Sequence, residues 1–463
     1  MDHRSALLSA RLDRLPGWPY RRVVFLAVGI GYFFAYFDIG NIGYALPRVI
    51  EALHADKASA AIVLSGGLWG YIAGGAVNAI VSDRLGRRAG LMVGALMYGL
   101  GSLGTAVAGD MTFFGAARFV SGMGIGATLA VFSTYVSEIS PAERRGRYIS
   151  LVALPAMIGT ATVPFISLGL VPTFDWGWRA LLAIPALGTL GFIAAFKLLP
   201  ESPRWLAVSG RFDEAEALVS AAEDRVRQAT GAELPAVPEV VSEGEADRGI
   251  LVIFKRPVFR WTVLFFVLWF VLYLGDYGFL GLGVTLITEH GFDLKHSIQM
   301  TLGSSAGLII GSVLAPYIAD RWPRKYIGAA FAFIAALGWA WVAFQPAMVP
   351  IMVMYFLYQL KIGASQSQMY LLTAEHFPTR GRTAGVSLAN GGGHVGGAIA
   401  PFVLLFMLDT FGFGSVWATI AAMSLLVGVL TLFTRNTTGV SLESVSQKAP
   451  GPDAVETVAK SGG

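Results

Sequence analysis

The chain of 463 residues contains no cysteine, and only 14% of its residues are charged. The missing cysteine excludes disulfides, thiolate metal sites and cysteine nucleophiles. A soluble domain has about 25% charged residues, so the low charge argues against a soluble enzyme and a disordered chain. The 34 Lys and Arg exceed the 30 Asp and Glu by only four, which argues against a nucleic-acid-binding protein.

Two enzyme motifs are also missing. The sequence has no His-Glu-x-x-His zinc motif and no phosphate-binding loop with Lys-Ser or Lys-Thr. We therefore expect no catalytic residues, no metal site and no cofactor, and an ATP-driven pump is unsupported.

Long apolar runs dominate the sequence. Hydrophobic residues make up 55% of the chain, and a membrane-spanning helix needs about 20 of them in succession. The sequence predicts an all-α polytopic membrane protein with twelve transmembrane helices. The twelve runs are 23–46, 59–81, 89–109, 112–136, 148–171, 180–199, 260–288, 298–319, 326–345, 349–372, 383–408 and 413–434.

Basic residues alternate between the loops. The N-terminal segment and the loops after runs 2, 4, 8 and 10 are rich in Arg, whereas the other short loops carry few Lys or Arg. Because positive loops stay on the cytoplasmic side, we expect both termini in the cytoplasm. A bacterial inner, or plasma, membrane is the expected location.

These patterns divide the chain into five parts. They are a cytoplasmic N-tail (1–22), a six-helix bundle (23–199), a cytoplasmic loop with a short helix (200–259), a second six-helix bundle (260–434) and a disordered cytoplasmic C-tail (435–463). We expect Asp213 to be the N-cap of the loop helix, and the acidic stretch 239–247 to be a linker.

The two bundles repeat one another. Asp38 and Asp276 differ by 276 − 38 = 238 positions, and Glu138 and Glu375 differ by 375 − 138 = 237. Gly66, Gly70 and Gly74 recur 237 positions later as Gly303, Gly307 and Gly311. This predicts two pseudo-symmetric halves in parallel orientation, with a central site between them.

Several motifs resemble those of the major facilitator superfamily. Asp83-Arg84-Leu85-Gly86-Arg87-Arg88 is similar to the signature of the loop between helices 2 and 3, and 320–325 repeats it. Arg118-Phe-Val-Ser-Gly122-Met-Gly124-Ile-Gly126 resembles the helix 4 motif of proton-coupled members. The resemblance implies the superfamily fold, a small-molecule substrate, proton coupling, a lipid-bilayer environment and a monomer.

Two further motifs indicate which branch of the superfamily the chain resembles. Pro200-Glu201-Ser202-Pro203-Arg204-Trp205-Leu206 is similar to the motif of sugar porters and organic-ion transporters, and 437–443 resembles their terminal motif. The Gln-Gln pair of sugar porters is missing from 273–277. This favours the metabolite:proton symporters of that branch.

Four charged residues lie within apolar runs, where each costs about 3 kcal/mol or more. They are Asp38, Arg118, Asp276 and Lys361. By resemblance, their helices line the central cavity. Depths estimated at ~1.5 Å per residue allow Asp38 to pair with Arg118 and Asp276 with Lys361.

Each charge pair has two interpretations. Asp38 with Arg118 is either a proton-coupling pair, the role that resemblance implies, or a static ion pair. Lys361 is either a counter-ion for an anionic substrate or a neutralising partner of Asp276. Further candidates for substrate binding are Gln359, Asn390, His394, Tyr36, Tyr273 and Tyr277, although aromatic residues and a lone His also serve in packing.

The charged loop residues are candidates for a cytoplasmic gate. By resemblance, they would close the cytoplasmic side of the transporter, whereas the alternative is that their Arg residues only set orientation. The candidates are Asp83, Arg84, Gly86, Arg87, Arg88, Glu138, Arg147, Asp320, Arg321, Arg324, Glu375 and Arg382.

These features predict a secondary active transporter that takes up a small organic metabolite with protons by alternating access. A carboxylate, such as an aromatic acid, is the expected substrate because Arg118, Lys361 and His394 are basic. A sugar or polyol:proton symporter and a proton-driven efflux antiporter remain alternatives. A non-transporting sensor is disfavoured because 200–259 is short for an output domain.

Overall fold

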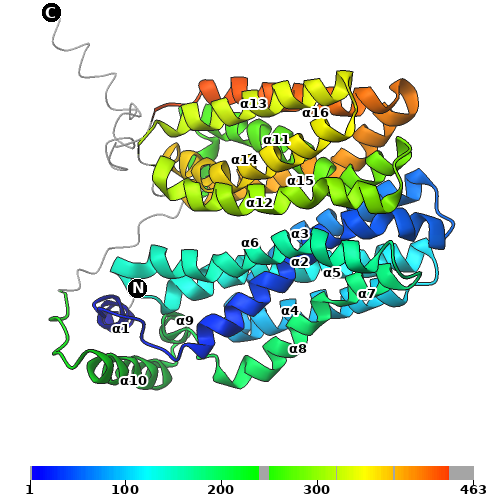
Figure 1. Ribbon diagram of the computed structural model, residues 1–463. Coiled ribbons are helices and arrows are strands. Elements are labelled where there is room, and N and C mark those ends of the chain that lie inside the picture. Colours follow the sequence, from blue (N-terminus) through cyan, green and yellow to red (C-terminus); the bar gives the residue numbers. More distant parts are fainter. Residues whose placement is uncertain (1–2, 239–249, 320, 379–380, 437–463) are drawn as a thin grey trace, which may run out of the picture. The chain divides into compact units, whose positions relative to one another are not determined.

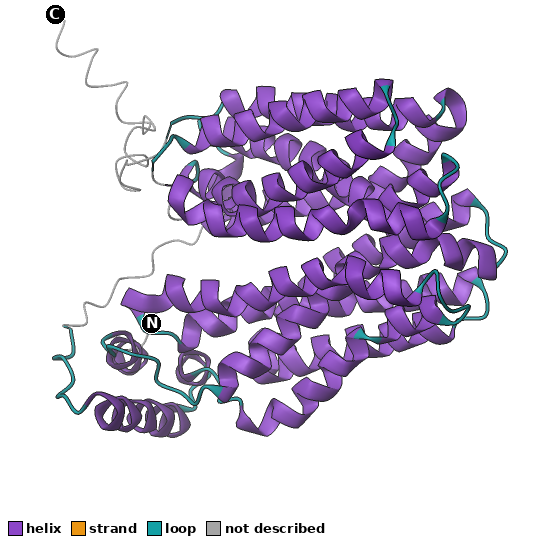
Figure 2. Ribbon diagram, viewed as in Figure 1, coloured by secondary structure: helices purple, strands orange, loops and turns teal. Residues whose placement is uncertain are grey.

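The computed structural model describes residues 3–238, 250–319, 321–378 and 381–436, and these contain helices and no strands. The chain forms two compact units, Met1–Glu245 and Ala246–Gly463. Each unit holds six helices long and apolar enough to cross a membrane (Figure 1, Figure 2). The prediction of a twelve-helix, all-α membrane protein is confirmed. The expected linker 239–247 and the terminal motif 437–443 lie outside the described residues.

Unit 1 begins with a short helix and continues with its spans. Its described helices are α1 (His3–Asp13), α2 (Val23–Ala52), α3 (Lys57–Leu85), α4 (Arg87–Val107), α5 (Met111–Ile139), η1 (Ala142–Arg144), α6 (Arg145–Leu170), α7 (Gly177–Ala183), α8 (Pro185–Ala195), η2 (Phe196–Leu198), α9 (Pro203–Val208) and α10 (Phe212–Thr230).

Unit 2 repeats this order of spans after one short 3-10 helix, η3. Its described helices are η3 (Ile250–Phe254), α11 (Phe259–Glu289), α12 (Leu294–Ala319), α13 (Arg324–Phe344), α14 (Met348–Glu375), α15 (Arg382–Phe411) and α16 (Phe413–Leu432). The packing repeats as well, because α3 packs extensively on α5 as α12 does on α14, and α2 on α6 as α11 does on α15.

The sixth span differs from the single run expected over 180–199. It consists of α7, α8 and a final turn, η2, with α7 ending at Ala183 and α8 starting at Pro185. Proline has no backbone N–H and fits the first position of a helix. The physical reason for the interruption is therefore in the sequence, although an apolar run alone does not show it.

Repeated glycines hold equivalent helices at very short distance. A Cβ added at Gly74 would lie 1.9 Å from the backbone oxygen of Met123 on α5, and one added at Gly311 would lie 2.2 Å from that of Leu360 on α14. Met123 and Leu360 are themselves 360 − 123 = 237 positions apart. The glycine repeat therefore marks a close helix–helix contact in each half, as in other membrane helix pairs with small residues.

Helices α1, α9 and α10 of unit 1 form a subdomain at one end of its bundle (Figure 1). Leu8 of α1 is buried in a cluster with Trp205, Leu206 and Val219 from α9 and α10. The sequence predicted the loop helix, but α1 was not expected, because 3–13 is polar and basic.

The predicted N-cap of the loop helix was wrong. α10 starts at Phe212 with Arg211 at the N-cap, and Asp213 lies in the first turn. There its carboxylate is 3.4 Å from the guanidinium of Arg4, which is a favourable position for an acid near a helix N-terminus.

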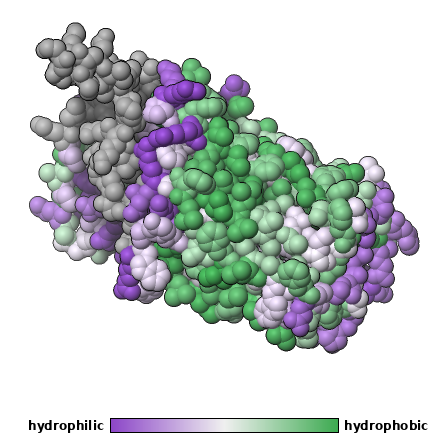
Figure 3. Space-filling model, turned by 90° about the horizontal axis from the view of Figure 1, so that it is seen from above, coloured by the Kyte–Doolittle hydropathy of each residue, from purple (hydrophilic) through white to green (hydrophobic). Residues whose placement is uncertain are grey.

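Hydrophobic side chains lie on the surface as well as inside. Leu337 and Phe344 of α13 are 74% and 90% exposed, and Leu425 of α16 is exposed too. On the face seen in Figure 3, hydrophobic residues gather in a broad middle zone and hydrophilic residues lie at both ends. A surface of this kind fits a hydrocarbon environment better than water.

Candidate transport site

A buried ion pair lies in the interior of unit 1. The Nη1 atom of Arg118 on α5 is 2.8 Å from Oδ2 of Asp38 on α2, and Nη2 donates to the backbone oxygen of Asp38 at 3.1 Å. Asp38 is 1% exposed and Arg118 6%. The pairing expected from their depths is confirmed.

Three further donors surround the carboxylate of Asp38. Ser121 donates to Oδ2 at 2.7 Å, and Ser102 and Asn41 donate to Oδ1 at 3.1 and 3.4 Å. All three are fully buried. These hydrogen bonds and the Arg118 guanidinium reduce the cost of burying a carboxylate. Sequence reasoning missed these three residues, because small polar residues carry no distinctive signal.

A second buried ion pair lies in unit 2. The Nζ atom of Lys361 on α14 is 2.9 Å from Oδ1 of Asp276 on α11. Tyr358 donates its hydroxyl to the same oxygen at 2.6 Å, and its ring lies 4.4 Å from Nζ. The pairing of Asp276 with Lys361 is also confirmed.

The four membrane charges therefore form two neutral pairs, one inside each unit. This reduces the cost of burial, because each charge has an opposite partner and hydrogen bonds. That all four face one central pocket stays a prediction.

Four of the predicted binding residues gather in a third cluster, on α11 and α15 in unit 2. The Tyr273 and His394 ring centroids are 5.1 Å apart, and the Tyr277 hydroxyl is 3.4 Å from Nε2 of His394. Asn390 donates its amide to the Tyr273 hydroxyl at 3.3 Å. We call Tyr273, Tyr277, Gln366, Tyr370, Asn390 and His394 the aromatic–amide cluster.

Helix α14 completes the aromatic–amide cluster. Gln366 donates to the Tyr273 hydroxyl at 3.0 Å, and Asn390 donates to the Tyr370 hydroxyl at 2.7 Å. Tyr370 was missed at the level of sequence, since a tyrosine in an apolar run is an ordinary packing residue. The cluster combines ring faces with amide and hydroxyl groups, which suits a small ligand with polar substituents.

The hydrogen bonds of His394 place a proton on Nδ1. Nδ1 lies 3.0 Å from the backbone oxygen of Asn390, which can only accept, so Nδ1 donates to it. Nε2 lies 3.4 Å from the Tyr277 hydroxyl, a group that can donate or accept. Two predicted binding residues lie outside the cluster: Tyr36 is half-buried on α2 of unit 1, and Gln359 is buried on α14.

Most of the predicted gate residues of unit 1 meet at the turn between α3 and α4. Arg87 donates to both carboxylate oxygens of Glu138 at 2.8–3.1 Å and to Asp83 at 2.6 Å. Arg88 donates to the backbone oxygen of Phe196 at 2.9 Å. Arg84 and Arg147 are exposed, and neither lies in this cluster.

The segment 200–205 is part of the same cluster. Glu201 accepts from the backbone N–H of Arg87 at 3.0 Å and so caps α4, and Trp205 donates to the backbone oxygen of Asp83 at 2.8 Å. Burial raises the pKa of Glu201, although three backbone N–H groups oppose this. Gly86 has φ +102°, and a Cβ there would lie 2.4 Å from Glu201, so this turn requires glycine.

The gate residues of unit 2 form a smaller version of this cluster. Arg324 is 2.9 Å from Glu375, and both side chains are largely buried, with 11% and 13% exposed. Arg382 donates to the backbone oxygen of Ala374 at 3.2 Å. Arg321 is exposed, and Asp320 lies outside the described residues.

Known transport proteins resemble the chain over nearly its whole length. A family model described as Major Facilitator Superfamily matches residues 28–387. The putative metabolite transport protein YdjK of Escherichia coli is 30% identical, over 94% of this chain and 96% of its own. The niacin transporter NiaP of Acinetobacter baylyi is 26% identical, over 95% of this chain and 99% of its own length.

The solved structures agree on the fold. The inward-open structure of the Escherichia coli xylose transporter XylE superposes with a TM-score of 0.73, at 19% identity, over 92% of this chain and 99% of that one. Together with the twelve spans and the internal repeat, these matches identify the chain as a multi-pass membrane transporter that belongs to the Major Facilitator Superfamily.

Proposed function

We propose that the protein is a proton-coupled importer of a small organic acid, with an aromatic carboxylate as its substrate, working by alternating access. The observation that carries the coupling is the Asp38–Arg118 pair, in which a buried carboxylate is 2.8 Å from a guanidinium. Ionisable residues inside membranes are costly and functional by default. A change in the distance between them during transport would bind and release a proton.

The aromatic–amide cluster supports the substrate class. Tyr273 and Tyr277 present rings, while Gln366 and Asn390 supply amide donors within 3.3 Å of a tyrosine hydroxyl. A flat ring with a polar substituent matches both features. Among the relatives, NiaP is named a niacin transporter and PcaK of Acinetobacter baylyi, 27% identical over 92% of this chain, a 4-hydroxybenzoate transporter.

A sugar or polyol:proton symporter is the second candidate. The aromatic–amide cluster contains no Asp, Glu, Lys or Arg, and its amide and hydroxyl groups with aromatic rings also suit a polyol. The galactose-proton symporter of Escherichia coli is 29% identical to the chain, over 92% of this chain and 93% of its own length.

Transport by purified protein in liposomes tests the proposal. An imposed pH gradient, acid outside, should drive uptake of radiolabelled 4-hydroxybenzoate or nicotinate, and galactose serves as the competing probe. Asp38→Asn should abolish accumulation driven by the gradient and retain exchange of substrate across the membrane, because Asn resembles the protonated acid. Unchanged accumulation in this variant would remove Asp38 from the coupling step.

Asp110→Asn is the matched control. Asp110 is exposed and caps α5 by accepting from the N–H of Phe113 at 2.9 Å, and Asn is an equally good N-cap. This substitution should leave both accumulation and exchange unchanged.

A further inference from the structure

The internal repeat relates the two buried carboxylates and one hydroxyl donor of each. Asp276 follows Asp38 by 238 positions, and Tyr358 follows Ser121 by 358 − 121 = 237. Ser121 donates to Asp38 at 2.7 Å, and Tyr358 donates to Asp276 at 2.6 Å. Asp276 with Tyr358 is therefore the unit 2 copy of the carboxylate–hydroxyl pair in unit 1.

The basic partner has moved between the copies. Arg118 precedes Ser121 by three residues, whereas Lys361 follows Tyr358 by three. At ~1.5 Å rise per residue, the backbone positions of the two cations lie ~4.5 Å to opposite sides of the hydroxyl residue along the helix. The two halves thus hold equivalent acids, but the cation comes from the N-terminal side of the hydroxyl residue in unit 1 and from its C-terminal side in unit 2.

The two carboxylates also differ in how many hydrogen bonds they accept. Both oxygens of Asp38 accept hydrogen bonds from side chains. In the described part of unit 2, Lys361 and Tyr358 both bond to Oδ1 of Asp276, and no hydrogen bond to Oδ2 is present. Asp276 therefore retains an oxygen on which a proton can be placed.

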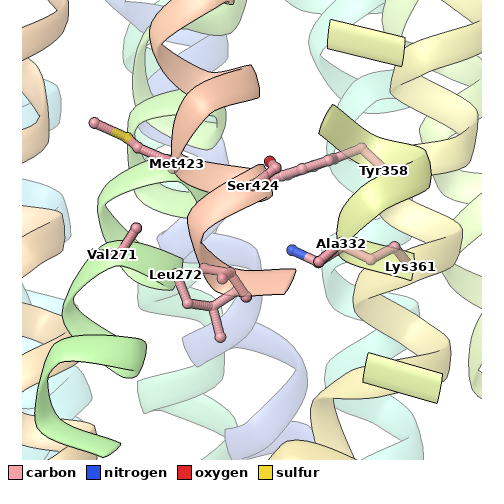
Figure 4. Close-up of a pocket in the computed structure, with 9 residues that line it drawn as sticks. Val271, Leu272, Ala332, Tyr358, Lys361, Met423 and Ser424 are labelled. Carbon is pink, nitrogen blue, oxygen red and sulfur yellow. The ribbon is translucent and has the colours of Figure 1, made fainter. Parts of the chain in front are cut away.

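A small cavity adjoins the cation of this pair. Its interior is about 10 Å³, enough for about one water molecule. It is lined by Lys361 and Tyr358 of α14, Leu272 of α11, Ala332 of α13 and Ser424 of α16, among others. Figure 4 shows Lys361 extending into the space between these helices. Because an ammonium has three N–H donors and Asp276 accepts one of them, the others are available to water.

Within the described part of unit 2, Lys361 and Tyr358 of α14 are the titratable groups that bond to Asp276. On α11, Tyr273 and Tyr277 point toward His394 of α15. Helix α16 has no charged or titratable residue. Those of α12 and α13 are at the helix ends: Lys295, His296, Tyr317, Arg324, Lys325 and Tyr326.

We propose that Asp276 is a second proton-binding residue of this transporter, with Lys361 as its counter-charge and Tyr358 as its fixed hydroxyl donor. A proton delivered by water bonds to Oδ2 and gives the neutral acid, while the Lys361 ammonium turns to the cavity water. Release to water on the other side of the membrane restores the ion pair. This inference rests on the proposed function, because it adds a second proton to the same transport cycle.

Infrared titration of the purified protein tests proton binding without any substrate. The C=O stretch of protonated carboxyl groups is followed above pH ~5, where exposed Asp and Glu are already ionised. The double variant Asp276→Asn/Lys361→Gln removes both charges, so no unpaired charge is buried. The double variant should lose one titrating carboxyl component that the wild type and Asp38→Asn retain. A titration of the double variant identical to that of the wild type would overturn the proposal.

Asp293→Asn is the control for this titration. Asp293 is exposed, and the hydrogen bonds from His296 lower its pKa, so it is ionised throughout the range. The variant should therefore leave the titration unchanged.

Accumulation in liposomes supplies a second measurement. One proton fewer per substrate lowers steady-state accumulation by about tenfold for each unit of pH gradient. The double variant should show this loss with 4-hydroxybenzoate as probe, and accumulation equal to wild type would contradict a second proton. If the wild type transports none of the probes, the proposed function fails, and the infrared titration still decides whether Asp276 binds a proton.

Discussion

Nη1 of Arg324 lies 2.9 Å from Oε1 of Glu375, and this pair repeats the Arg87–Glu138 pair of unit 1. Both members are displaced by the same number of positions, since 324 − 87 and 375 − 138 are both 237. The loop signature therefore preserves one cross-helix ion pair in each half, between the third and fourth spans of the half. Positive loop charges alone orient a membrane protein in the bilayer, without any acidic residue. Glu138 and Glu375 therefore indicate an additional role, which is to join these helices.

Breaking this pair should destabilise unit 2. Glu375→Gln leaves the largely buried Arg324 without its carboxylate, and we expect a loss of ~3 kcal/mol in the free energy of unfolding. Thermal unfolding in detergent measures it. Arg211→Gln is the control, because its pair with Glu214 is half exposed and should contribute little. Equal melting temperatures for the wild type and Glu375→Gln would contradict the prediction.

Two of the repeated glycines, Gly74 and Gly311, should tolerate no side chain. Gly74→Ala and Gly311→Ala place a Cβ 1.9 and 2.2 Å from backbone oxygens, and either must separate two packed helices. We expect a large loss of folded protein in size-exclusion chromatography after extraction. At Gly66 the added Cβ has no atom within 4 Å, so Gly66→Ala should fold normally. Similar yields for all three variants would refute this account of the packing.

His376 should make stability depend on pH. Its Nδ1–H donates to Leu372 and its Nε2 accepts the N–H of Arg435, so the native contacts need the neutral ring. Burial lowers its pKa to about 4, from an ordinary value of 6.5. The unfolded chain therefore takes up a proton before the native state does, and stability falls as pH decreases from 6.5 to 4.

The expected loss is at most ~3 kcal/mol, from a shift of about two and a half pH units. Thermal unfolding at a series of pH values should show this slope for the wild type and less of it for His376→Gln. The exposed residue His3 provides the control, because His3→Gln should keep the wild-type slope. An unchanged slope in His376→Gln would show that another group is responsible.

Glu223 should fix α1 to α10. It accepts hydrogen bonds from Arg11 at 2.8 Å and Arg14 at 2.6 Å. Burial raises the pKa of Glu223, but these bonds outweigh burial and lower it below 4.5. The stabilisation is thus present above pH 4.5 and is lost as the pH falls through the lowered value.

Glu223→Gln should release α1, which would appear as faster amide hydrogen exchange over residues 3–13. The neighbouring Asp224 pairs only with Arg227 in an exposed position, so Asp224→Asn should leave exchange in α1 unchanged. Equal exchange in both variants would show that the leucine contacts of α1 suffice.

The sequence predicted the membrane charges and their partners because each feature is local or periodic. Run length gives the spans, the repeat gives the halves, and depth along a helix pairs Asp38 with Arg118. It could not identify Ser102, Ser121 or Asn41, because which face of a helix meets another depends on packing. The side chain of Arg147 is exposed, and its role in the gate stays a prediction.

By itself, the sequence determined the twelve spans, the duplication and the four membrane charges whose depths allow two neutral pairs, since hydrophobic burial and the cost of an unpaired charge in lipid depend mainly on residue type and spacing. Only the tertiary structure decided that both oxygens of Asp38 are occupied while Oδ2 of Asp276 accepts no hydrogen bond in the described part of unit 2. The number of hydrogen bonds that reach a carboxylate depends on how helices distant in sequence rotate and pack, and this rotation is not encoded in any single run.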